Sequence, residues 1–60
     1  MIKKGDIFTV YKENFPTENV MATMDYREGY LLYCINKDGK VVHVSSYEIG
    51  EVLANIDDLK

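Results

Sequence analysis

The sequence has no tryptophan, and its 60 residues include only one cysteine, one histidine and one proline. The lone Cys34 excludes a disulfide within the chain and favours a reducing compartment. No apolar run approaches the roughly 18 residues of a membrane-spanning helix. The basic start MIKKGD is not followed by the apolar segment of a secretion signal. We therefore expect a single cytoplasmic domain, residues 1–60, without membrane contact.

The residue sets that hold cofactors are also missing. The four glycines stand singly along the chain, so there is no glycine-rich loop to cradle a phosphate group. One cysteine and one histidine are too few for a zinc site within one chain. The sequence therefore predicts no metal, no cofactor and no enzymatic activity.

The charge balance is mildly acidic: seven Lys/Arg stand against ten Asp/Glu, a net charge of −3. Non-specific binding to nucleic acid requires clustered cations that neutralise phosphates, so this balance disfavours it. A chain this short also buries only about 60% of its unfolded surface. Its core is therefore expected to be marginal, and a homodimer is one way in which such a chain could gain stability.

The clearest local signal is a hairpin in YLLYCINKDGKVVHVS. The pair Asp38-Gly39 suits a two-residue type I′ turn, because both central positions need a positive φ. That turn sets a register in which Cys34 opposes His43 and Tyr33 opposes Val44. Strand alternation then predicts one apolar core face and one mixed face. The predicted core face carries Leu31, Tyr33, Ile35, Val42 and Val44.

Two further strands are expected upstream of the hairpin. Residues 6–12 alternate with Phe8 and Val10 on one face. Residues 19–26 alternate with Val20, Ala22, Met24 and Tyr26 on the core side. Between these strands lies a loop at residues 12–18, in which Pro16 holds Phe15 extended and blocks a helix.

The stretch SSYEIGEV, residues 45–52, allows two interpretations. Ser45 and Glu48 have capping-box spacing, and apolar residues follow at helical spacing, which together favour a helix over about residues 46–58. Gly50 opposes that helix, since glycine costs about 1 kcal/mol in a helix interior. The alternative is a short 3-10 corner near residues 45–49 followed by a closing strand at about 51–54, with Glu48 capping backbone amides.

A resemblance favours the corner. The tracts KKGDIFTVY (residues 3–11) and YLLYCINKDGKVVHVSSYEIGEV (residues 30–52) resemble the small SH3-like barrels of bacterial and phage proteins. The resemblance spans residues 2–52. It implies an all-β fold, an SH3-like barrel of four to five antiparallel strands in which a fifth strand closes the sheet. A four-stranded antiparallel sheet with a C-terminal helix is the alternative fold.

Aromatic residues are the most informative candidates for function. The chain has five tyrosines and two phenylalanines, and aromatic side chains at strand ends and in loops are frequent anchors of protein interfaces. The proposed partner-binding residues are Tyr11, Phe15, Tyr26, Tyr30, Tyr47 and Glu51, with Tyr30 expected opposite Tyr47. Cys34 and His43, expected to face each other across the hairpin, are interpreted as structural residues rather than as a nucleophile and its base.

These features favour a small non-catalytic protein-binding module, such as a phage- or mobile-element-encoded regulator or inhibitor of a host protein. A nucleic-acid-binding barrel is the second hypothesis, because related barrels stack aromatic side chains on bases. The third hypothesis is a homo-oligomeric assembly protein.

Overall fold

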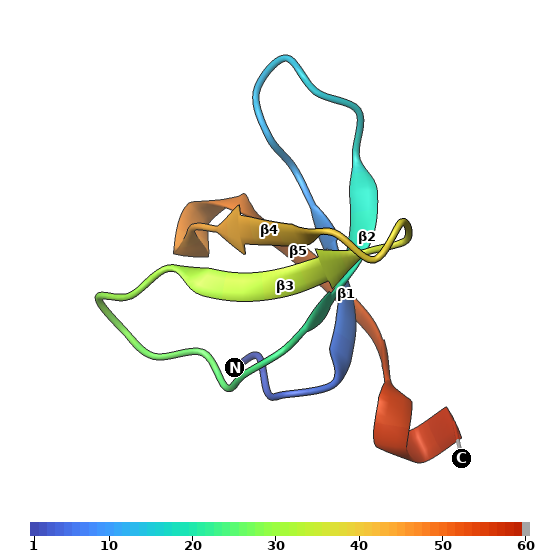
Figure 1. Ribbon diagram of the computed structural model, residues 1–60. Coiled ribbons are helices and arrows are strands. Elements are labelled where there is room, and N and C mark those ends of the chain that lie inside the picture. Colours follow the sequence, from blue (N-terminus) through green and yellow to red (C-terminus); the bar gives the residue numbers. More distant parts are fainter. Residues whose placement is uncertain (60) are drawn as a thin grey trace.

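The computed structural model describes residues 1–59, whose five strands form one open antiparallel sheet (Figure 1). The strand order is β4-β3-β2-β1-β5, so the first four strands form a meander and the fifth returns beside β1. This all-β architecture with five antiparallel strands was expected. Within residues 1–59 the edge strands β4 and β5 do not pair with each other. The elements are β1 (Asp6–Val10), β2 (Glu18–Ala22), β3 (Leu32–Asn36), β4 (Val41–Val44), the 3-10 turn η1 (Ser46–Glu48), β5 (Ile49–Asn55) and the 3-10 turn η2 (Ile56–Leu59).

The core lies on one face of the curled sheet. Phe8 and Val10 of β1 share one face, as predicted, and that face points inward, where both residues are buried. Met24 and Tyr26 follow β2 and pack partly buried against this core, also as predicted. The buried set is Ile2, Phe8, Val10, Val20, Ala22, Leu32, Cys34 and Val44.

The predicted hairpin register is wrong by one residue. Tyr33 pairs with His43, and Cys34 pairs with Val42. The connection is a three-residue loop in which only Gly39 has a positive φ, of 80°, and the Gly39 amide donates to the Asn36 carbonyl at 3.0 Å. The Asn36 side chain decides the outcome, because its Oδ1 accepts the Asp38 amide at 2.9 Å and the Lys40 amide at 3.0 Å. These bonds stabilise the three-residue loop over the type I′ turn.

A one-residue slip exchanges the two faces of a strand. Leu32 and Cys34 of β3 are therefore buried, whereas Leu31 and Tyr33, predicted to lie in the core, are exposed and Ile35 is only partly buried. The faces of β4 are as predicted, with Val44 buried and Val42 packed against the core.

The corner interpretation of residues 45–49 is confirmed and the C-terminal helix is wrong. Residues 46–48 form a single 3-10 turn, and residues 49–55 form β5, a strand longer than expected. Glu48 caps the turn as predicted: its Oε1 accepts the Ser45 amide at 2.8 Å. Gly50 fits because a Cβ at this position would collide with the Thr9 hydroxyl and the Tyr11 ring of the neighbouring segment. The helical spacing of the apolar residues is therefore overridden by packing against β1.

The chain ends in a feature that was not predicted, the turn η2, which projects beyond the sheet (Figure 1). It is tied to the N-terminal turn, since the Ile56 amide donates to the Gly5 carbonyl at 2.9 Å. The Asn55 side chain donates to Asp6 Oδ1 at 2.8 Å. No helix within residues 1–59 is long and apolar enough to cross a membrane.

Candidate protein-binding surface

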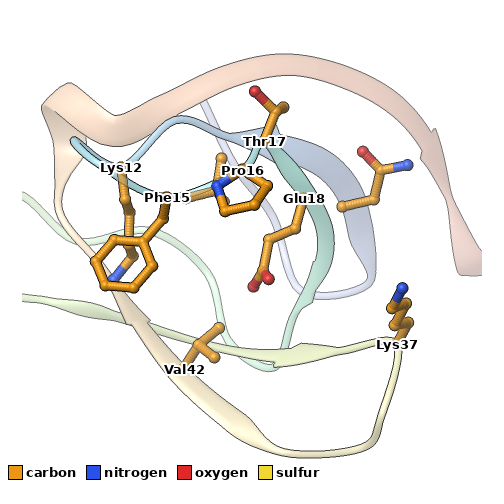
Figure 2. A pocket seen from close by; sticks show the side chains of 9 residues that line it. Lys12, Phe15, Pro16, Thr17, Glu18, Lys37 and Val42 are labelled. Atoms are coloured by element: carbon orange, nitrogen blue, oxygen red, sulfur yellow. The ribbon is translucent and has the colours of Figure 1, made fainter.

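A pocket of about 760 Å³ opens between the β1–β2 loop and the β3–β4 hairpin (Figure 2). Its floor is apolar, because Val10 and Val42 belong to the inward face of the sheet. Phe15 and Pro16 stand over this floor from the loop. The remaining lining residues are polar or charged: Lys12, Thr17, Glu18, Asn19 and Lys37.

The β1–β2 loop displays Phe15 instead of burying it. Asn14 has a φ of 66°, a left-handed conformation that asparagine tolerates better than most residues. The Phe15 amide donates to the Lys12 carbonyl at 3.1 Å, which closes a tight turn just before the ring. Pro16 then keeps Phe15 extended. The Phe15 side chain is 71% exposed, as expected for a displayed anchor.

Lys12 connects the β1–β2 loop to the end of β4 and to η1. Its Nζ donates to the His43 carbonyl of β4 at 2.7 Å and lies 4.0 Å from Glu48 Oε1. The Tyr11 amide donates to the Glu48 carbonyl at 2.9 Å. These contacts join the end of β1, the end of β4 and η1. They therefore hold the Lys12 side of the pocket entrance in place.

The other predicted partner-binding residues do not gather at this pocket. Tyr11 and Tyr47 are exposed, at the end of β1 and in η1. Tyr26 is partly buried and lines a second hollow of about 380 Å³, together with Ile2 and Ile49. Of the six predicted residues, only Phe15 lines the larger pocket.

Tyr30 and Tyr47 are not brought opposite each other by the observed register. Because Leu32 pairs with Val44, extending the ladder would place Tyr30 across from Ser46. Tyr30 instead lies in the β2–β3 connection, where the Arg27 guanidinium carbon is 5.5 Å from the centre of its ring. Glu51 is an exposed residue of β5, and its amide donates to the Thr9 hydroxyl at 2.8 Å.

Cys34 and His43 are not neighbours either, since they lie on opposite faces of the hairpin. His43 meets Tyr33 edge to face, with ring centres 4.8 Å apart. Cys34 is buried, and desolvation raises the pKa of its thiol to about 11. A thiol held protonated, with no imidazole beside it, behaves as a small apolar core residue.

Sequence reasoning missed most of the pocket. Lys12, Glu18 and Lys37 carried no signal of their own, because each is an ordinary charged residue near a turn. Val42 was predicted to be a core residue. It forms part of the pocket floor because the loop at residues 11–17 does not cover this part of the sheet.

Comparisons with known proteins gave no match: no family model, curated protein or solved structure is significantly similar to the chain. Within residues 1–59, no cluster of three or more histidine, cysteine or acidic side chains is arranged to hold a metal ion. The candidate site is an apolar hollow with an aromatic side chain and charged residues at its rim.

Proposed function

We propose that this protein is a non-catalytic protein-binding module with an SH3-like barrel fold, acting as a stand-alone regulator or inhibitor of a larger protein. The strand connectivity supports the fold: a four-stranded meander, a 3-10 corner and a fifth strand beside β1. This is the order that the resemblance of residues 2–52 implies.

The observation that carries the proposed function is Phe15 above the apolar floor of the larger pocket. The Phe15 ring lies at the surface, although burial of a phenylalanine side chain would stabilise the fold by about 1.5–3 kcal/mol. Val10 and Val42 offer apolar contacts beneath it. Aromatic anchors beside such hollows are typical of the centres of protein interfaces.

Site-specific photocrosslinking tests the proposal. A photoreactive amino acid replaces Thr17, which lines the pocket, and a matched control carries it at Asp58 of η2. In lysate of the source cell, we expect a discrete crosslinked protein from position 17 that is absent from position 58. The purified partner should then bind the unmodified chain. The same products from both positions, or none from position 17, would contradict the proposal.

The proposal extends to the origin and place of action of the protein. A phage- or mobile-element-encoded regulator would act in the cytoplasm on a protein of its host. The position of the gene tests this part separately, because neighbours among phage early genes support it and neighbours among housekeeping genes oppose it.

A further inference from the structure

Strand β4 forms one edge of the sheet, and its hydrogen-bonding groups alternate in direction. The Asn36 amide donates to the Lys40 carbonyl at 2.9 Å, so that pair is a hydrogen-bonded one. In an antiparallel ladder every second pair is of this kind. Val42 and Val44 therefore bond to β3, whereas Val41 and His43 direct their amides and carbonyls away from β3.

One half of this free edge is already occupied. The His43 carbonyl accepts the Lys12 ammonium group at 2.7 Å. The next outward group, the Ser45 amide, donates to Glu48 Oε1 at 2.8 Å. Lys12 and Glu48 also face each other at 4.0 Å. The end of β4 next to η1 is therefore closed to another strand, which is how many proteins protect their sheet edges.

The other half of the edge, toward the hairpin tip, is open. Within residues 1–59 the Val41 amide, the Val41 carbonyl and the His43 amide have no hydrogen-bond partner. The Val41 side chain is 63% exposed. Val42, between these residues, points into the larger pocket (Figure 2). The open backbone groups thus lie beside an apolar hollow.

Lysines outnumber acidic residues among those lining the pocket beside this edge, although the chain as a whole carries −3. Lys12 and Lys37 line the pocket at the two ends of β4, and Lys40 precedes Val41. Neither Lys37 nor Lys40 forms an ion pair within residues 1–59. Glu18 is the one acidic residue among those lining the pocket.

We propose that the open half of the β4 edge binds an extended acidic segment of the partner protein as a sixth strand. This inference rests on the proposed function and names the class of its ligand. The segment residue opposite Val42 is apolar and enters the pocket, since paired residues share a face. Carboxylates two positions before and after it lie on the same face. One lies opposite Lys40 and near Lys37, and the other lies beyond the last open backbone group, near Lys12. Pairing of this kind is a known mode of peptide recognition.

A second copy of the chain fits this edge less well. If two β4 strands paired about Val42, Lys40 of each copy would lie opposite Val44 of the other, close to the other copy's Lys12. Like charges meeting across a strand pair are destabilising. Charge complementarity therefore favours an acidic segment of a different protein.

Peptide titration tests the inference, with the acetylated and amidated pentapeptide Asp-Thr-Ile-Thr-Asp as the probe. We expect changes in amide NMR signals centred on Val41–His43, with slower hydrogen exchange at the Val41 amide. Methylation of both threonine nitrogens should weaken binding at least tenfold, and so should replacement of both aspartates by lysine. Binding that survives either change, or changes that centre on η1 and β5, would overturn the inference.

Substitution of Val41 gives an independent test of the sixth strand. Val41→Pro removes only an amide that points away from β3, so the β3–β4 ladder stays intact. The matched control Val41→Thr keeps the amide. We expect at least tenfold weaker peptide binding by Val41→Pro and less than a twofold change by Val41→Thr. If Val41→Pro does not fold, the double variant Lys37→Glu, Lys40→Glu replaces it, and it should bind the lysine peptide in preference to the aspartate peptide.

Two results separate this inference from the proposed function. Crosslinking from position 17 together with an absence of peptide binding would overturn the sixth strand and leave the binding module in place. Sedimentation that shows a dimer of the wild-type chain, abolished by Val41→Pro, would overturn the acidic segment as the occupant in favour of a second copy.

Discussion

Two adjacent leucines offer the sharpest test of the hairpin register. The Leu32 side chain is 1% exposed and the Leu31 side chain is 47% exposed, so the same substitution probes the two faces of one strand. Replacing a buried leucine by alanine costs about 2.7–5 kcal/mol, because transfer energy is lost and a cavity remains. A chain of 60 residues has a total stability of about 3–9 kcal/mol, at roughly 0.05–0.15 kcal/mol per residue. We therefore expect Leu32→Ala to remove about 30% or more of the stability, and Leu31→Ala to cost less than about 1 kcal/mol.

Urea unfolding followed by circular dichroism measures both variants. With an m-value of about 1 kcal/mol/M, the Leu32→Ala midpoint should fall by roughly 3–5 M, while that of Leu31→Ala moves little. If Leu32→Ala leaves no folded baseline, Val44→Ala and Val41→Ala repeat the comparison with one buried and one exposed valine. Equal losses, or a larger loss for the residue that the structure exposes, would refute the observed register.

Four further outcomes are expected. Burial raises the pKa of the Cys34 thiol from 9.0 to about 11, so Cys34 should have about a hundredfold less thiolate at pH 8 than an exposed thiol. Cys34 should therefore react with a chromogenic thiol reagent, followed by absorbance, only after the protein unfolds. Fast labelling of the folded protein would contradict this expectation. The hydrogen bond from Asn55 lowers the pKa of Asp6. The ionised Asp6 carboxylate therefore stabilises the fold at pH values above its ordinary pKa of 3.8, and this stabilisation is lost on acidification. Urea midpoints at pH 7 and pH 3 should differ less for Asp6→Asn than for the wild type. Gly50→Ala should cost about 1–3 kcal/mol in urea unfolding, because the new Cβ displaces the Tyr11 ring, and an unchanged midpoint would argue against that contact. Mobility-shift titrations at low salt should show no binding to single-stranded or duplex nucleic acid, whereas a salt-dependent shift would favour the nucleic-acid hypothesis.

Most of the fold was predictable because alternation and turn residues act locally. Phe8 and Val10 share one face of β1 through strand alternation, and that face lies inward. The corner at residues 46–48 was harder, since Ser45 and Glu48 suit a helix start equally well. Its outcome was decided by the fit of Gly50 beneath Tyr11, a contact between segments about 40 residues apart that no local pattern contains.

The hairpin register failed for a similarly specific reason. Asp38-Gly39 is a strong type I′ signal, but it is also compatible with a three-residue loop that places only the glycine at a positive φ. The Asn36 side chain stabilises the three-residue loop, because its Oδ1 accepts hydrogen bonds from the Asp38 and Lys40 amides. Because a slip of one residue exchanges the faces of a strand, this single side chain also determined which residues could form a site.

The candidate site was only partly visible in the sequence. Phe15 was named because it lies beside Pro16 in the first long loop, where an aromatic side chain is expected to be displayed. The floor under it required knowledge of which β4 residues face inward and of where the Lys12 side chain crosses to β4. Such long-range contacts depend on tertiary packing, which the local patterns of a sequence do not record.

Protein binding through the pocket beneath Phe15 is measured by isothermal titration calorimetry, as the dissociation constant of the purified crosslinked partner. Phe15→Ala should raise this constant at least tenfold, which corresponds to about 1.4 kcal/mol. Leu59→Ala, which truncates a similarly exposed apolar side chain in η2, should change it less than twofold. Equal constants for the wild type and Phe15→Ala would contradict the account.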